Sequence, residues 1–191
     1  MKDKIRSQIL DSIRVKESIL NSCINDIKRA ANILLKSVQD GGKVLWCGNG
    51  GSAADAQHLS TELMGGMNDH NRKAIPSIAL TTDTSFLTAW TNDTDFESIF
   101  SRQVQGIGRK NDVLIGISTS GNSNNIIAAI NQAKFKNLFT IGLTGKKGNK
   151  MDGLADVTIC VPSTDTQRIQ EGHIMIGQIL CGLIESNLMQ K

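Results

Sequence analysis

The sequence predicts an α/β protein in which a five-stranded, parallel, doubly wound sheet follows a helical extension at the N-terminus. Two patterns carry this prediction. After residue 41, five short apolar runs alternate with helical segments, which is typical of a parallel sheet covered by helices on both faces. Before that point, over residues 5–38, apolar residues recur at spacings of three and four, as they do on one face of a helix.

The expected elements follow in chain order. Residues 5–38 form one helix or two, because the polar pair Lys16-Glu17 interrupts the periodicity. The strands are expected at residues 43–47, 76–80, 112–118, 138–144 and 156–161. A last amphipathic segment, residues 167–188, predicts a long closing helix.

The length of the chain favours one domain. A core of ordinary size needs most of the 191 residues, so we expect a single domain over residues 1–191. The helices of residues 1–40 exceed what a sheet built from residues 41–191 requires. We therefore expect part of this extension to pack against another subunit.

The composition points to a small ligand and a cytoplasmic location. Lys plus Arg number 21 against 18 Asp plus Glu, and this charge of +3 is too small and too scattered for a nucleic-acid surface. The charged first twenty residues lack the apolar core of a signal peptide, and no apolar stretch approaches membrane-spanning length. The four cysteines form no CxxC pair, so we interpret them as reduced core residues. We expect neither a direct nucleic-acid partner nor a membrane.

Two strand-to-helix turns are typical of phosphate sites. The first strand runs into residues 48–52, Gly-Asn-Gly-Gly-Ser, where glycines let backbone N–H groups approach a ligand. This loop matches neither the glycine motif of dinucleotide-binding proteins nor that of nucleoside-triphosphate-binding proteins. The third strand runs into residues 118–123, where four hydroxyls meet the free N–H groups at a helix start. Either loop alone is explained by turn formation and capping, but parallel strands place both at one edge, which favours a small phosphorylated ligand.

Asp55, His58 and Glu62 follow the first loop at spacings that place all three on one helix face. The imidazole and the carboxylate four residues apart can share zinc, or the carboxylate can act as a general base. A solvated helix face is the commoner explanation of such a pair, but the nearby phosphate-type loop favours function. We interpret His70 as an exposed loop residue and His173 as a hydrogen-bonded structural histidine or a residue facing the sheet.

These segments together resemble one known family. The matching residues are Cys47 to Ser52 with Asp55, His58 and Glu62, then Asn92-Asp93, then Gly116 to Ser123, then Arg168-Ile169-Gln170-Glu171. In order and spacing they resemble the phosphoheptose isomerases, whose SIS domain is flavodoxin-like, over nearly the whole chain. The resemblance implies an aldose–ketose isomerase that converts sedoheptulose 7-phosphate to D-glycero-D-manno-heptose 7-phosphate for lipopolysaccharide or capsule heptose. It also implies a homotetramer with active sites at subunit interfaces.

The resemblance also implies the roles of single residues. The sugar phosphate would contact Asn49, Gly50, Gly51, Ser52, Glu62, Asn92, Asp93, Ser118, Thr119, Ser120, Ser123 and Gln170. Zinc would be held by His58, Glu62, Gln170 and Gln178. The catalytic positions would be Glu62 and Gln178, since an enediol mechanism needs a base, a second proton carrier and positive charge beside the developing oxyanion.

Gln178 departs from the family, which has a histidine at this position. An amide can offer its oxygen to a metal but cannot exchange a proton near neutral pH. We therefore expect weaker zinc binding, with proton transfer through a water or through His173. The departure also keeps a second class open, a catalytically impaired SIS paralogue acting as a tetrameric adaptor for the bacterial replication initiator. Glu62 is retained here and lost in that adaptor, which favours the isomerase.

Overall fold

All five predicted strands are present, and they form one parallel sheet. The computed structural model describes residues 1–189, so the last two residues of the predicted domain lie outside the described residues. The strands are β1 (Val44–Gly48), β2 (Ser77–Ala79), β3 (Val113–Ser118), β4 (Phe139–Thr144) and β5 (Val157–Cys160). Their order is β2-β1-β3-β4-β5, so β1 pairs with β2 on one side and with β3 on the other. The strands that precede the two candidate loops are therefore neighbours.

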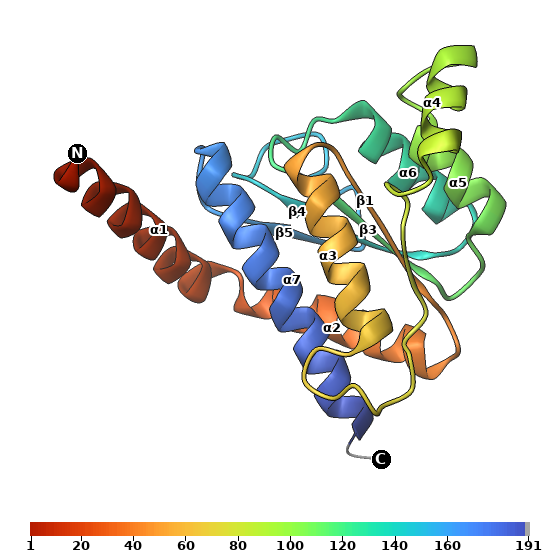
Figure 1. Cartoon of the computed structure of the whole chain (residues 1–191), viewed down its shortest axis with the longest axis horizontal. Helices are drawn as coiled ribbons and strands as arrows, with labels where there is room; N and C mark the ends of the chain where they lie inside the picture. The colour runs from red at the N-terminus through yellow and green to blue at the C-terminus, as the bar shows by residue number, and fades with distance from the viewer. Residues whose placement is uncertain (190–191) are drawn as a thin grey trace.

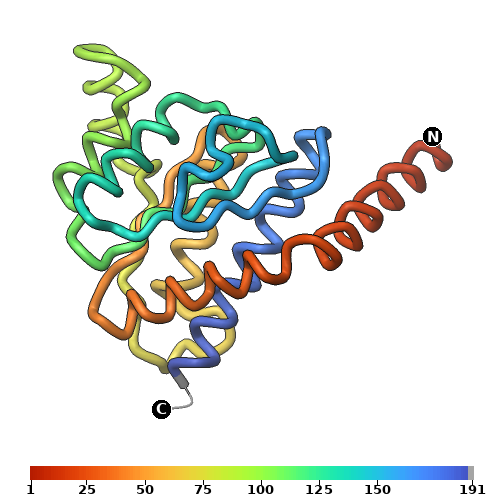
Figure 2. The backbone as a smooth tube through the Cα atoms, turned by 180° about the vertical axis from the view of Figure 1, so that it is seen from behind, coloured from red at the N-terminus to blue at the C-terminus, as the bar shows by residue number. Residues whose placement is uncertain are grey.

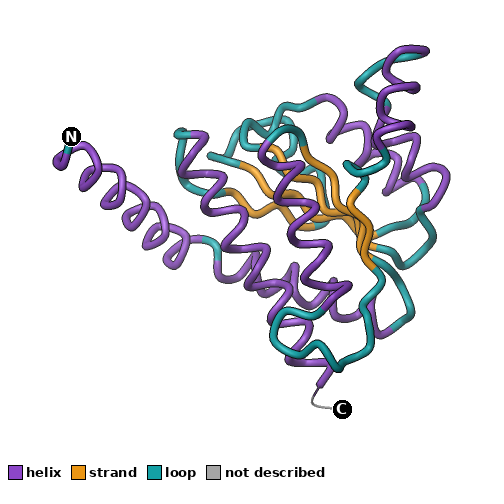
Figure 3. The backbone as a smooth tube through the Cα atoms, in the orientation of Figure 1, coloured by secondary structure: helices purple, strands orange, loops and turns teal. Residues whose placement is uncertain are grey.

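Helices cover both faces of this sheet (Figure 3). They are α1 (Lys2–Ser22), α2 (Ile24–Gln39), α3 (Gly51–Gly65), α4 (Thr84–Asp93), α5 (Ile99–Ile107), α6 (Asn124–Phe135) and α7 (Thr166–Met189). The closing helix α7 matches the predicted segment closely. The fold class expected from the sequence is confirmed.

The N-terminal helical region divides into two helices at Cys23 rather than at Lys16-Glu17. Lys16 and Glu17 lie within α1, where both side chains are exposed, so the two charged residues do not interrupt the helix. Cys23 is only 3% exposed, and its thiol donates to the carbonyl of Cys160 at the end of β5. This contact with the sheet edge fixes the position at which the chain changes direction.

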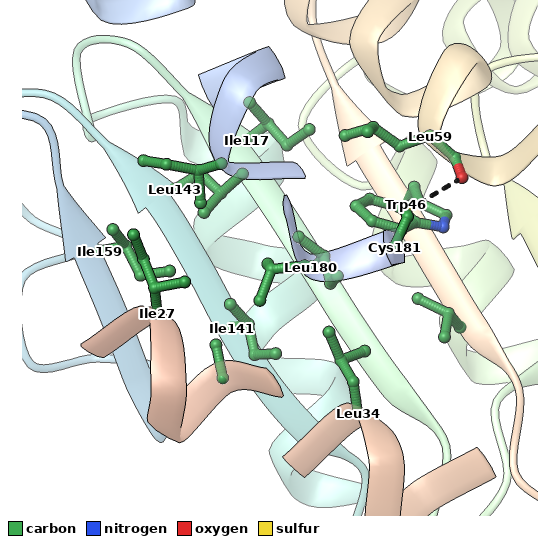
Figure 4. Packing of buried hydrophobic residues seen from close by; sticks show 14 of the residues in the cluster. Ile27, Leu34, Trp46, Leu59, Ile117, Ile141, Leu143, Ile159, Leu180 and Cys181 are labelled. Carbon is green, nitrogen blue, oxygen red and sulfur yellow. Dashed lines mark hydrogen bonds between the residues drawn. The ribbon is translucent and has the colours of Figure 1, made fainter. Parts of the chain in front are cut away.

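Each face of the sheet has its own core because successive side chains of a buried strand point to opposite faces. Trp46 of β1 belongs to the cluster with Leu34 and Leu59, under α2, α3 and α7 (Figure 4). Its neighbour Leu45 belongs to the cluster with Ile126, under α5 and α6. The strands are apolar throughout because they are covered from both sides.

Helix α1 extends away from the rest of the chain, as Figures 1 and 2 show from opposite sides. Four large apolar side chains of this helix are 45–63% exposed: Ile5, Ile9, Ile13 and Leu20. Within the described residues, Ile19 is the one buried residue of α1. An apolar stripe on a projecting helix lacks a partner in the single chain. No helix within residues 1–189 has the length and apolar character needed to cross a membrane.

Candidate active site

The first loop makes a tight connection between β1 and α3. Gly50 has a φ of +55°, in the left-handed region that favours glycine. A side chain at Gly48 would overlap the backbone of Ser52, and a side chain at Gly51 would overlap the amide of Gln170. Glycine is therefore required at position 48 for close approach of the backbone, and the start of α3 lies directly against the Gln170 side chain at the start of α7.

The second loop gathers three serine hydroxyls at the end of β3. The hydroxyl oxygen of Ser118 lies 2.9 Å from that of Ser123 and 3.3 Å from that of Ser120. Ser123 also precedes α6, whose first N–H groups have no partners within the helix. Thr119 is half-buried, and its carbonyl accepts from the N–H of Gly145. Convergent hydroxyls at a helix start form an arrangement suited to a phosphate group.

An asparagine pair joins the two loops. The side-chain amides of Asn49 and Asn125 each donate to the oxygen of the other at 2.9 Å. Asn125 is 2% exposed and was not singled out from the sequence. The two loops meet between β1 and β3, where the chain reverses its direction of progress across the sheet, and ligands of open α/β sheets bind at this switch point.

Helix α3 places His58 and Glu62 side by side. The His58 Nε2 lies 3.0 Å from the Glu62 Oε1, and their side chains are 49% and 20% exposed. Asp55, one turn earlier, is half-buried, and one of its carboxylate oxygens has no hydrogen-bond partner. Burial raises the pKa of Asp55, while a hydrogen bond from Gln170 and the nearby His58 oppose this effect. The predicted placement of these three residues on one face is confirmed.

Helix α7 runs beside α3, carries both glutamines of the predicted site and brings Gln170 to the start of α3. Gln170 lies at the start of α7 against Gly51, and Gln178 is half-buried two turns further along. The helices approach closely because a side chain at Gly177 would overlap Leu59. The thiol of Cys181 donates to the carbonyl of Leu59 at the same contact, drawn as a dashed line in Figure 4.

His173 is a structural histidine. Its ring is fully buried, and its Nε2 lies 3.0 Å from the carbonyl oxygen of Thr144 at the end of β4. Burial lowers the pKa of His173 to about 4, although the hydrogen bond to Thr144 opposes this shift. An uncharged ring enclosed in the core is poorly placed to exchange protons with a ligand, so the structure does not support His173 as the proton carrier. His70, by contrast, is exposed, as expected.

Asn92 and Asp93 are not brought into the loops. They bond to each other at 2.8 Å at the exposed end of α4, a helix without buried residues. Neither forms a hydrogen bond to the two loops within the described residues. The segment after α4 does return to the second loop, because the carboxylate of Glu97 accepts from the side chain of Asn124 at 2.8 Å.

The candidate metal ligands include only two residues of the types that most often bind zinc. Within residues 1–189, no three His, Cys, Asp or Glu side chains lie together as a metal site requires. The predicted set consists of one imidazole, one carboxylate and two amides, and the first two are already in contact. The imidazole and carboxylate suit zinc, and the amides can contribute only neutral oxygen atoms.

The sheet order and the paired loops define a SIS-domain protein, and the family model described as SIS domain matches residues 10–145. The chain is 49% identical to the phosphoheptose isomerase of Aneurinibacillus thermoaerophilus, covering all of this chain and 96% of that protein. It is 51% identical to phosphoheptose isomerase 2 of Campylobacter jejuni, covering 98% and 94%. The structure of phosphoheptose isomerase from Neisseria gonorrhoeae superposes with a TM-score of 0.91 at 41% identity, covering 97% and 98%. The chain belongs to the phosphoheptose isomerase family and is an isomerase.

Proposed function

We propose that this protein converts sedoheptulose 7-phosphate to D-glycero-D-manno-heptose 7-phosphate in the cytoplasm, for the heptose of lipopolysaccharide or capsule. The observation that carries the proposal is the joining of two phosphate-type loops through Asn49 and Asn125, with the His58–Glu62 pair on the helix that begins in the first loop. Full-length similarity to phosphoheptose isomerases supports the same reaction. The adaptor alternative is not favoured, because the relatives compared above carry the isomerase name.

The phosphate group would bind at the second loop. The hydroxyls of Ser118, Ser120 and Ser123 converge there, and the start of α6 adds N–H donors and the positive end of its dipole. The remaining substrate contacts are proposed for Asn49, Gly50, Gly51, Ser52, Thr119, Asn92, Asp93 and Gln170. Asn92 and Asp93 would reach the sugar from α4 of this or a neighbouring subunit.

Glu62 would act as the base. Its carboxylate removes the proton from C1 of the ketose, the electron pair forms the enediol, and the proton is returned to C2 as the carbonyl forms at C1. The proton that leaves the oxygen on C1 and the one that reaches the oxygen on C2 need a second carrier. The Gln178 amide acts as neither acid nor base near neutral pH, so we propose that a water carries these protons and that Gln178 holds this water or the substrate.

Zinc is the proposed cofactor, with His58, Glu62, Gln170 and Gln178 as the residues that would hold it. When bound, the ion would supply positive charge next to the oxygen that becomes negative in the enediol. The His58–Glu62 contact supports binding of a cation, since imidazole and carboxylate are both zinc ligands. Gln178 would offer zinc an amide oxygen where the family offers an imidazole. We therefore expect weaker zinc binding than a histidine at position 178 would give.

We further propose one SIS domain over residues 1–191 and a homotetramer in which residues 1–40 pack between subunits. The exposed isoleucines of α1 support this assembly, because a stripe of apolar residues on a projecting helix is stabilised by a second copy. A groove lined by Leu20, Ile24, Ile27, Ile179 and Leu183 continues the apolar surface onto α2 and α7. Helix α4, which has no buried residue, provides a second surface.

The proposed function is tested by adding sedoheptulose 7-phosphate to the purified protein and following the aldose product by NMR. Zinc content and sedimentation equilibrium are measured on the same preparation. Turnover by a tetramer that contains zinc supports every part of the proposal. A tetramer with neither turnover nor zinc would instead support a binding role.

A further inference from the structure

The side chain of Arg72 binds the last turn of α3, which carries Glu62. The Nη2 of Arg72 donates to the backbone carbonyls of Glu62 and Leu63 at 2.9 and 2.8 Å. The same two carbonyls also accept from the N–H groups of Gly66 and Ile75, and the arginine adds a cation, which interacts favourably with the helix dipole at a helix C-terminus. The Arg72 side chain is 7% exposed, so these bonds are shielded from water.

Glu185 of α7 fixes this arginine. Its carboxylate accepts from the Nε of Arg72 at 2.7 Å and from the backbone N–H groups of Met67, Asn68 and Asp69 at 2.8, 2.7 and 3.0 Å. Burial alone would raise the pKa of Glu185, but these four donors outweigh burial and lower the pKa to about 2. The Glu185 side chain is 1% exposed and ionised at neutral pH, so the pair is a buried, hydrogen-bonded ion pair.

The pair connects the two helices that carry the candidate site. Arg72 binds the main chain of Glu62 itself, and Glu185 lies on α7 two turns beyond Gln178. We infer that Arg72 and Glu185 are positioning residues, which fix α3 lengthwise against α7 and thereby set the position of the Glu62 carboxylate relative to the residues of α7. This inference rests on the proposed function, because it takes Glu62 as the base.

A second buried ion pair in the chain provides a matched comparison. The Nζ of Lys43 lies 2.5 Å from the Oδ2 of Asp112, with side chains 18% and 4% exposed. Lys43 precedes β1 and Asp112 precedes β3, so this pair lies at the amino edge of the sheet, opposite the two loops. Loss of either pair should destabilise the fold, but only loss of Arg72–Glu185 should disturb Glu62.

The test compares the full-length variants Arg72→Lys, Glu185→Gln and Lys43→Met with the wild type. Lysine keeps the charge of arginine but lacks the planar fork of donors with which Arg72 spans the carboxylate and the two carbonyls. The measurements are kcat, KM, the melting temperature, and the NMR ring resonances of His58 at one fixed pH, which can be assigned because the chain has three histidines. If Glu185→Gln does not fold, Glu185→Asp keeps the charge and displaces the carboxylate by one methylene.

We expect the Arg72 and Glu185 variants to lower kcat about tenfold or more, because small displacements of a catalytic group are costly, while KM changes less. The His58 resonances should shift in these variants and not in Lys43→Met, which should lose stability at nearly unchanged kcat. Wild-type kcat and wild-type His58 resonances in folded Arg72→Lys would overturn the inference, as would an equal loss of kcat in Lys43→Met. If the wild type has no isomerase turnover, the proposed function fails, and the His58 resonances still decide whether the pair positions α3.

Discussion

Asn49 and Asn125 each donate to the other through their side-chain amides, at 2.9 Å in both directions. The pair links the loop after β1 to the first turn of α6, so the relative position of the two loops is fixed before a ligand binds. An amide pair of this kind uses one donor and one acceptor of each residue, and the remaining donors and acceptors are free for other contacts.

Replacing Asn125 by alanine should therefore weaken substrate binding. The change removes two hydrogen bonds of about 0.5–1.5 kcal/mol each, so we expect KM to rise about tenfold and kcat to fall less. Steady-state kinetics with sedoheptulose 7-phosphate measure the effect. Asn131→Ala, on an exposed position of the same helix, is the matched control. A KM equal to that of the control would show that the asparagine pair does not organise the site.

Replacing Ser120 and Ser123 together by alanine should lower the affinity for the sugar phosphate at least about tenfold. Each hydroxyl would contribute a hydrogen bond to a charged group, worth about 1.5–3 kcal/mol. Titration calorimetry with sedoheptulose 7-phosphate provides the dissociation constants. Ser7→Ala, on the exposed helix α1, controls for the loss of a hydroxyl in general. Unchanged affinity in the double variant would place the phosphate elsewhere.

Replacing Gln178 by histidine should raise both zinc content and turnover above the wild type. The imidazole adds a stronger zinc ligand and a group that titrates near neutral pH, and a placed proton carrier typically contributes roughly 10² to 10⁴ in rate. Metal analysis and the isomerase assay on the same samples measure the two effects. His173→Gln should leave most of the activity, since that ring is bonded to Thr144 in the core. A Gln178→His protein that gains neither property contradicts this account.

His173 should make the fold less stable as the pH falls from 6.5 towards 4. Its pKa is lowered from 6.5 to about 4 by burial, so the unfolded chain binds a proton in this range and the folded chain does not. The stability is therefore complete above pH 6.5 and decreases by roughly 1.4 kcal/mol per pH unit below it. Urea unfolding at pH 7 and pH 5 measures this loss. His173→Gln should show a smaller loss between these two values, and an identical loss would refute the assignment. Glu185, with a pKa lowered from 4.5 to about 2, stabilises the fold fully above pH 4.5, so it adds to the loss of stability only below that pH.

The sequence was sufficient for the features that depend on local pattern. Five apolar runs gave five strands, and the loops at residues 48–52 and 118–123 lie where parallel strands end. Glycine, serine and helical spacing are local signals, so the approach of His58 to Glu62 could also be predicted. These features need no knowledge of which helix packs on which.

The contacts between distant segments had no such signal. Asn125 lies 76 residues from Asn49, and Glu185 lies 113 residues from Arg72. Neither an asparagine after a loop nor a glutamate on an amphipathic helix differs in sequence from a solvated residue. The position of the break between α1 and α2 at Cys23 could not be predicted for the same reason. The Cys23 thiol bonds to the carbonyl of Cys160, which lies 137 residues away in the sequence.

The contact between Gly177 and Leu59 has a consequence for how this site can change over evolution. Helices α3 and α7 are as close as they are because one side chain is absent at position 177. A single added methyl group there would lie 2.3 Å from the Cδ1 of Leu59, so either the Leu59 side chain or helix α7 would have to move, with every candidate ligand unchanged. Selection can therefore alter the packing of α3 against α7 through a residue outside the proposed ligand set.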